Sequence, residues 1–309
     1  MDAGIVFQQM LVILLLVLAG FLTRRSGMVG SGHSGALSKL VSSVFNPALI
    51  ISSMISDPSP KNYAEIRTVF LAAALMYAFL FAAAYLLTAG RRRTYRDKTA
   101  LRLIYIFPNL GFIGIPVVRA VLGEHYILYV AIFMLEFSIL IYSYGELQLE
   151  EGARFSLKSL RPMLNIGTFG SLLALFLFFT EIPLPVPVAS ALEILGSATT
   201  PVAMIVTGFA IAEQSDLKKI LTDGSTWVCT LLKMLVIPAA FILLLKVLPL
   251  PEDIRALSLI MTAMPAANMP LILISEKGWD TGLYSRVIML TTVLSVITLP
   301  LLVLLYQAL

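Results

Sequence analysis

Ile106-Phe107-Pro108-Asn109-Leu110-Gly111-Phe112-Ile113-Gly114-Ile115-Pro116 is an apolar run that contains two prolines and two glycines. Proline lacks a backbone N–H and its ring clashes with the preceding helical turn, while glycine permits unusual backbone dihedrals. We therefore expect a helix to break within this run. A second run repeats the pattern, because Pro265-Ala266-Ala267-Asn268-Met269-Pro270 encloses an asparagine between two prolines.

The composition around these runs is that of a membrane protein. Of 309 residues, 59% are hydrophobic and only 13% are charged, whereas a soluble domain has about a quarter charged. A transmembrane helix needs roughly 20 mostly apolar residues, so we predict an all-α membrane protein of ten spans. The expected spans are 4–23, 36–55, 69–90, 99–121, 126–145, 163–181, 188–212, 225–248, 254–275 and 283–306.

The connections between the spans predict the topology. Those after the odd-numbered spans hold most of the 22 lysines and arginines, including the run from Arg91 to Arg93. Cytoplasmic loops carry such an excess of positive charge, so both termini are predicted to lie outside.

The polar stretch from Glu146 to Pro162 divides the chain into residues 1–150 and 151–309, with five spans in each half. Because five is odd, two halves of the same fold must enter the membrane from opposite faces, as an inverted repeat. The order of proline motifs supports this interpretation: Asn46-Pro47 corresponds to Thr200-Pro201, and Pro108 corresponds to Pro265.

The two broken spans, the fourth and the ninth, are the candidate functional site. Unwound backbone in hydrocarbon persists only where it is buried in protein or lines a polar cavity. The ends of half-helices carry free N–H groups and positive potential, which favour an anion. The alternative is that the prolines only kink helices for packing. The predicted binding residues are Pro108, Asn109, Gly111, Gly114, Pro265, Ala266 and Asn268, with Asn46 and Thr200 as further candidates.

Two ionisable residues lie inside predicted spans, where they are costly and often functional. Glu136 is in the middle of the fifth span, where it either exchanges a proton during transport or makes a structural hydrogen bond to a neighbouring helix. Lys233 lies about two turns inside the eighth span. It either extends its ammonium to the membrane surface or attracts an anion.

Several other classes of protein are not expected. The sequence contains no zinc-protease, nucleophile-elbow or nucleotide-binding motif, which argues against an enzyme and an ATP-driven pump. Cys229, His33 and His125 are too few and too scattered for a thiolate or imidazole metal site, so we expect no metal and no cofactor. The basic residues form no continuous stripe, so a nucleic-acid partner is not expected.

The run from Pro108 to Pro116 resembles the Asn-x-Gly-Phe-x-Gly-x-Pro pattern of the auxin efflux carrier family, which contains plant PIN-type carriers and bacterial permeases for malate and malonate. Similarity continues through residues 195–208 and 265–270. The resemblance implies a scaffold of spans one, two, six and seven, often forming a homodimer, and a transport domain of spans three to five and eight to ten. It further implies that a small organic anion binds where spans four and nine cross and is carried by elevator-like movement.

This chain differs from the plant carriers because it lacks a long hydrophilic loop between spans five and six. A permease of the bacterial inner membrane is therefore expected rather than an auxin carrier. Two alternatives remain open: a sodium-coupled bile-acid-type symporter, which would need acidic residues at the breaks, and a non-transporting receptor of the same fold.

Overall fold

The computed structural model describes residues 3–30, 33–55, 63–90, 94–150, 166–180, 182–213, 220 and 222–309. This part of the chain is helical, and its one β-bridge joins Pro108 to Ala266. Up to residue 150 the helices are α1 (Ala3–Arg25), α2 (His33–Leu40), η1 (Val41–Phe45), α3 (Asn46–Ile55), α4 (Tyr63–Ala89), α5 (Tyr95–Ile106), η2 (Leu110–Gly114), α6 (Ile115–Val121), η3 (Glu124–Tyr126), α7 (Ile127–Leu140), η4 (Ile141–Gly145) and α8 (Glu146–Gln148).

After residue 165 the helices are α9 (Ile166–Thr180), α10 (Val186–Ala212), α12 (Gly224–Leu231), η6 (Leu232–Val236), α13 (Ile237–Val247), α14 (Glu252–Thr262), α15 (Met269–Glu276) and α16 (Gly282–Ala308). Most of the polar stretch 146–162, which we expect to separate the two halves, lies outside the described residues, as do Arg91 to Arg93.

Seven helical stretches in the described residues are long and apolar enough to cross a membrane. They are Ala3–Arg25, Gly35–Ser52, Tyr63–Ala89, Glu124–Gln148, Val186–Ala212, Gly224–Val247 and Gly282–Ala308. The chain is therefore a multi-pass membrane protein. Of the other three expected spans, the fourth and the ninth are each divided into two shorter helices, and the sixth contains the 15 residues of α9.

Two of the long stretches and the shorter helical stretch Leu110–Val121 each contain a π-helical segment that ends two residues before a proline. The prolines are Pro47, Pro116 and Pro238, and each lacks the N–H that would complete the preceding turn. The residue before each proline instead donates its N–H to the carbonyl five residues back, which widens the turn. The three bonds run from Asn46 to Val41, from Ile115 to Leu110 and from Ile237 to Leu232.

Two glycines allow α1 and α10 to pack backbone against backbone. A Cβ atom added to Gly208 would overlap the carbonyl oxygen of Val17 and lie 2.6 Å from the nitrogen of Phe21. One added to Gly20 would overlap the carbonyl oxygen of Ile205. Small residues permit such close approach between membrane helices, where dispersion contacts replace the hydrophobic effect as the driving force.

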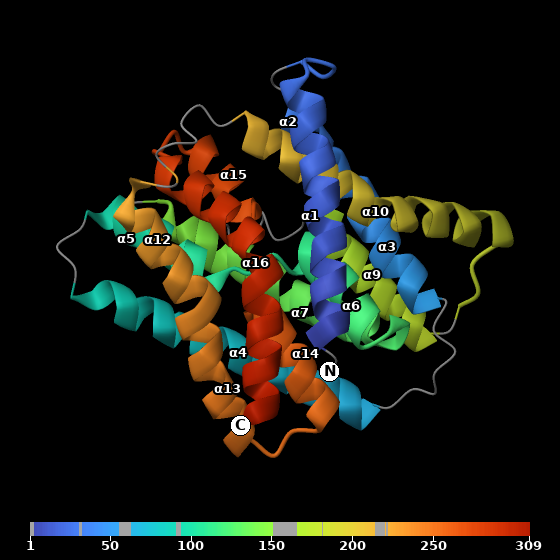
Figure 1. Ribbon diagram of the computed structural model, residues 1–309. Helices are drawn as coiled ribbons and strands as arrows, with labels where there is room; N and C mark the ends of the chain where they lie inside the picture. The colour runs from blue at the N-terminus through green and yellow to red at the C-terminus, as the bar shows by residue number, and fades with distance from the viewer. Residues whose placement is uncertain are drawn as a thin grey trace.

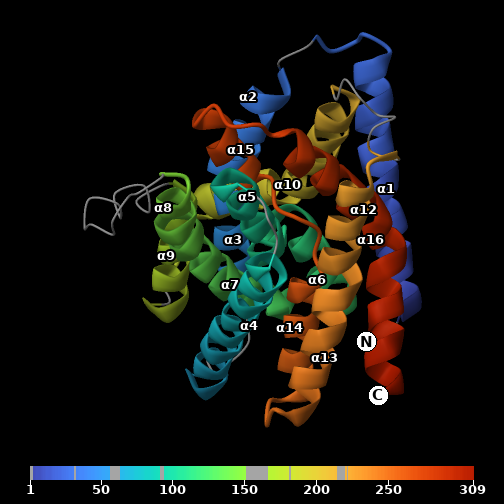
Figure 2. The same cartoon turned by 90° about the vertical axis from the view of Figure 1, so that its left-hand side faces the viewer.

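The helices form two groups in space. In Figure 1, α1, α3, α9 and α10 lie together toward the right, while α4, α5, α12, α13 and α15 lie toward the left, with α14 and α16 in the middle. Both termini lie at the lower end in Figures 1 and 2. Since α1 runs upward from the N-terminus and α16 runs downward to the C-terminus, Arg24, Arg25 and Arg286 lie at the opposite end.

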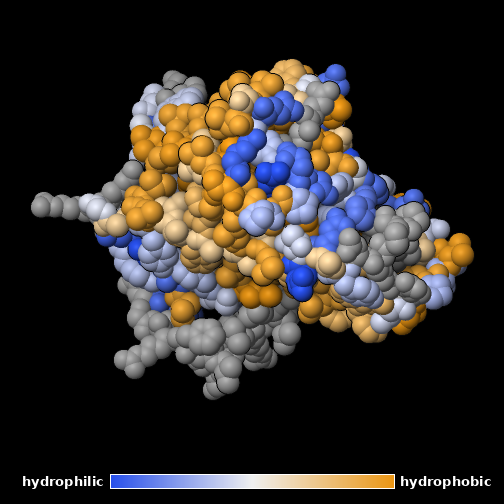
Figure 3. All heavy atoms as spheres, turned by 90° about the horizontal axis from the view of Figure 1, so that it is seen from below, coloured by the Kyte–Doolittle hydropathy of each residue, from blue (hydrophilic) through white to orange (hydrophobic). Residues whose placement is uncertain are grey.

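The outer surface is largely apolar, as a bilayer requires. Leucines such as Leu15, Leu71 and Leu86 are 63%, 64% and 77% exposed on the outsides of α1 and α4. Figure 3 views the molecule from the end that carries the termini, and hydrophobic side chains there surround a band of hydrophilic ones. The exposed apolar side chains are therefore the surface that faces lipid.

Candidate functional site

The breaks in the fourth and ninth expected spans meet and hydrogen-bond directly to each other. Helix α5 ends at Ile106 and η2 begins at Leu110, while α14 ends at Thr262 and α15 begins at Met269. The N–H of Asn109 donates to the carbonyl of Pro265 at 2.8 Å, and the N–H of Ala267 donates to the carbonyl of Phe107 at 3.0 Å. This antiparallel bridge satisfies backbone groups that would otherwise be unpaired at membrane depth.

Helix α16 supports the same crossing through two side chains that the sequence analysis did not identify. The hydroxyl of Thr291 accepts from the N–H of Ala266 at 3.3 Å. The buried hydroxyl of Tyr284 lies 3.3 Å from the carbonyl of Ala267 and 3.5 Å from that of Leu103, so it can donate to either. The sequence does show polar residues within this apolar helix. Many such residues bond only to their own helix, so their presence does not predict a contact with the breaks.

Asn109 forms the N-cap of the half-helix that follows the first break. Its side-chain oxygen accepts from the N–H of Phe112 at 3.3 Å, and the residue is buried. Among the described residues its amide nitrogen makes no hydrogen bond. An asparagine cap of this kind satisfies one free N–H of the helix while leaving the amide donor available to a ligand.

Asn46, from the second expected span, lies against this half-helix. A Cβ atom added to Gly111 would lie 3.0 Å from the amide nitrogen of Asn46, so the glycine makes room for the asparagine. The side-chain oxygen of Asn46 is buried and has no hydrogen-bond partner in the described part of the structure. Next to the candidate Thr200, Thr199 donates to the carbonyl of Phe45 at 2.9 Å and so joins α10 to this region.

Asn268 occupies the corresponding N-cap position of α15 but faces a different space. It lines a cavity of about 40 Å³ that is also lined by Thr207 on α10 and Ser285 on α16. A cavity of this size has room for about one water molecule and not for an organic acid. The structure thus brings the backbones of the two breaks together, while Asn109 and Asn268 face different neighbours.

Gly114 and Pro265 also lie at the crossing. A Cβ atom added to Gly114 would lie 3.1 Å from the terminal methyl of Met261 and 3.6 Å from Met264, so this glycine allows η2 to approach α14 closely.

Lys233 does not extend its ammonium to the membrane surface, so that part of the sequence analysis is wrong. Its side chain is 0% exposed and its ammonium donates to the carbonyl of Tyr105 at 3.2 Å. The acceptor lies in the last turn of α5, directly before the break, where a helix end carries partial negative charge. The π-helical segment before Pro238 carries Lys233, and the bundle leaves its stem no path to the surface.

Glu136 is away from the crossing. It is partly buried in a groove between α4 and α7, and it forms no hydrogen bond or ion pair with another described residue. Of the two alternatives for this residue, the structural hydrogen bond to a neighbouring helix is not seen among the described residues.

The chain as a whole matches the family described as membrane transport protein over residues 5–303. It belongs to this family. The match confirms the resemblance to the auxin efflux carriers, and the crossed breaks are the part of this transporter that carries their motif.

Two archaeal relatives match over nearly their whole length. An uncharacterized transporter of Methanocaldococcus jannaschii is 26% identical over 301 residues, which cover 94% of this chain and 96% of that protein. An uncharacterized transporter of Methanothermobacter thermautotrophicus is 26% identical over 307 residues, which cover 95% and 96%. The names of both relatives agree with a transport function, and neither name identifies a substrate.

Proposed function

We propose that this protein is a secondary transporter of a small organic anion, most simply a carboxylate, which binds at the crossing of the two broken spans. The observation that carries the proposal is the pair of backbone hydrogen bonds between Asn109 and Pro265 and between Ala267 and Phe107. They hold two half-helix N-termini at the same depth in the bundle, one capped by the side chain of Asn109 and the other beginning after Asn268. Half-helix N-termini at membrane depth bind anions without a buried basic side chain in contact.

Several neighbouring groups suit an anion. Asn46 brings a carboxamide to the N-terminal end of η2, and the hydroxyls of Thr207 and Ser285 lie beside Asn268. Lys233 adds a buried positive charge one turn from the break in α5. No carboxylate belongs to either break, so a sodium ion would find only neutral oxygens there, from backbone carbonyls and side-chain amides.

The proposed architecture is ten spans arranged as a five-plus-five inverted repeat. The two corresponding breaks, the termini at one end of the molecule and the two groups of helices in Figure 1 support it. We assign spans one, two, six and seven to a scaffold that pairs two copies of the chain in the cell membrane, and the other six to a moving transport domain. The 40 Å³ cavity beside Asn268 is too small for a carboxylate, so binding requires the transport domain to shift against α10.

The first experiment is a thermal-shift screen of the purified protein against mono- and dicarboxylates, since a ligand that binds only the folded state stabilises it. We then expect Asn109→Ala and Asn268→Ala each to weaken binding of the best carboxylate. Loss of one hydrogen bond to a charged ligand costs about 1.5–3 kcal/mol, or roughly ten- to a hundredfold in affinity.

Gln8→Ala is the matched control, because it removes an exposed carboxamide from α1, away from the crossing. It should bind the carboxylate as the unaltered protein does. If both asparagine variants keep wild-type affinity, the crossing is not the binding site and the prolines only shape the packing. If no carboxylate stabilises the protein, the substrate class is wrong.

A further inference from the structure

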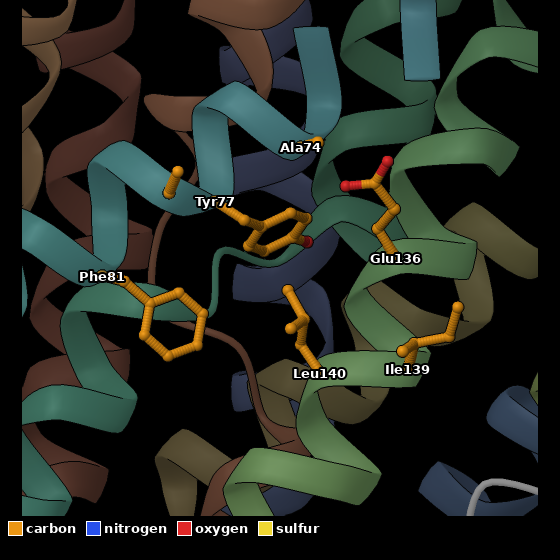
Figure 4. A pocket seen from close by; sticks show the side chains of 7 residues that line it. Ala74, Tyr77, Phe81, Glu136, Ile139 and Leu140 are labelled. Carbon is orange, nitrogen blue, oxygen red and sulfur yellow. The ribbon is translucent and has the colours of Figure 1, made fainter. Parts of the chain in front are cut away.

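A lateral groove of about 250 Å³ runs between α4 and α7, apart from the crossing (Figure 4). Glu136 lies near the middle of the 25-residue helical stretch Glu124–Gln148, so the groove is at mid-membrane depth. Helix α4 contributes Ala74, Tyr77, Ala78 and Phe81, and α7 contributes Glu136, Ile139 and Leu140.

The groove follows from the spacing of its residues. Ala74 and Ala78 are four residues apart, so their small side chains lie one above the other on α4 and leave the space open. Both alanines and Ile139 are exposed, which means that the groove opens on the outer surface of the bundle. A volume of about 250 Å³ is slightly below the pockets of drug-sized ligands, which measure roughly 300–1,000 Å³.

Glu136 carries the only carboxyl group among the described side chains that line the groove. Figure 4 shows its carboxyl at one end, near the ring of Tyr77. The hydroxyl of Tyr77 is directed to the carbonyl of Phe133, 3.5 Å away, and no lysine or arginine of the described part of the chain pairs with the glutamate. A polar group at this depth is stabilised only when it finds a partner.

We infer that this groove binds a lipophilic primary amine, with its nitrogen on Glu136 and its apolar body along Ala74, Ala78 and Phe81. A lipid chain alone would fill the groove but leave the carboxyl without a partner, and an organic anion would bring no base to accept its proton and no cation to pair with it. An ammonium group supplies up to three donors for the carboxylate and is also attracted to the faces of aromatic rings.

Binding transfers one proton from the protein to the ligand. The un-ionised amine enters the groove from the bilayer, and the proton of the Glu136 carboxyl moves to the amine nitrogen. The products are an ammonium and a carboxylate in contact, with no change in net charge. Charge-assisted hydrogen bonds of this kind are about twice as strong as neutral ones.

The groove lies on one side of α7, and another side of the same helix packs on the crossing. On the other side of α7, the ring of Phe137 stacks edge-on against Phe107 at 5.3 Å between centroids, and the methyl of Met134 would lie 3.2 Å from a Cβ atom added to Gly111. An amine on Glu136 would thus bind to the same helix, α7, that contacts the break through Phe137 and Met134, although its binding does not depend on the proposed transport function.

The test uses 4-phenylbutylamine and 4-phenylbutan-1-ol, which differ only in the polar group. Equilibrium binding of each to the purified full-length protein is measured at neutral pH. We expect the amine to bind at least about tenfold more tightly than the alcohol, and Glu136→Gln to reduce this preference below about threefold. Glu193→Gln, which removes an exposed carboxyl from α10, should leave the preference unchanged.

A second variant tests the location. Ala78→Leu fills the groove and should abolish binding of both compounds, and Ala74→Val serves the same purpose if Ala78→Leu does not fold. Equal affinity for amine and alcohol in the unaltered protein would overturn the proposal, because the groove would then recognise only apolar bulk. Retention of the preference in Glu136→Gln, or of amine binding in the filled groove, would also overturn it.

Discussion

Replacing Lys233 by methionine should make the protein more stable and less active at the same time. The ammonium is fully buried and its one hydrogen bond in the described structure is to the carbonyl of Tyr105 at 3.2 Å. Removing a charge from water costs several kcal/mol, and a hydrogen bond to a charged group returns only about 1.5–3 kcal/mol. Methionine has a similar length and no charge, so it fills the same space without the desolvation cost.

We therefore expect Lys233→Met to raise the free energy of unfolding by about 1–3 kcal/mol, since the desolvation cost of the ammonium exceeds what one hydrogen bond returns. The same change removes the positive charge beside the break in α5. Anion uptake per folded protein should fall at least about tenfold, which corresponds to about 1.4 kcal/mol of lost attraction.

The measurements are thermal unfolding of the purified protein and uptake of the best carboxylate into proteoliposomes. Lys246→Met is the matched control, because Lys246 is exposed at the end of α13, where its ammonium lies 4.3 Å from the ring centre of Tyr306. Lys246→Met should change neither the thermal stability nor the carboxylate uptake by much. If Lys233→Met is less stable than the unaltered protein and transports normally, Lys233 is a structural support for α5 and the reasoning is refuted.

Three further predictions concern helix packing, the hydrogen bonds of Asp223 and the membrane topology. Gly208→Ala should lower the free energy of unfolding by about 1–3 kcal/mol, because its Cβ would overlap backbone atoms of α1, whereas Gly90→Ala, which meets open space, should be neutral in the same thermal assay. Hydrogen bonds from Ser225, Thr226 and Arg286 hold the pKa of Asp223 well below its usual range. Asp223→Asn should therefore cost about 1–3 kcal/mol near neutral pH, and the difference from the unaltered protein should shrink as the pH falls below about 4, where the unfolded chain takes up the proton first. An effect that grows in acid would contradict this assignment. With Cys229 replaced by serine, an impermeant thiol reagent outside intact cells should label Leu309→Cys and not Arg96→Cys; the reverse pattern would invert the proposed topology.

The location of the breaks was predictable because proline acts locally. Pro108 and Pro265 remove a backbone donor wherever they stand, so the sequence was sufficient to end α5 and α14 near them. The π-helical segment before Pro238 follows the same rule, but one proline in a long apolar run does not by itself predict such a segment.

The partners of these residues were not predictable. Tyr284 and Thr291 support the breaks from α16, and nothing in the spacing of an apolar helix indicates which of its hydroxyls faces a broken neighbour. Lys233 lay near enough to the predicted end of its span for its stem to reach the surface, and only the packing of the bundle around η6 excludes that conformation.

The sequence by itself determined that this chain spans a membrane several times, that two of its helices break at corresponding positions, and which family it belongs to, because hydrophobic length, proline chemistry and motif identity are local properties. Only the tertiary structure decided that the two breaks hydrogen-bond to each other, that Asn46 lies against Gly111 while Asn268 faces Thr207, and that Lys233 is directed to the end of α5. These contacts join residues far apart in the chain, and they arise from the way the helices pack rather than from the preference of any one segment.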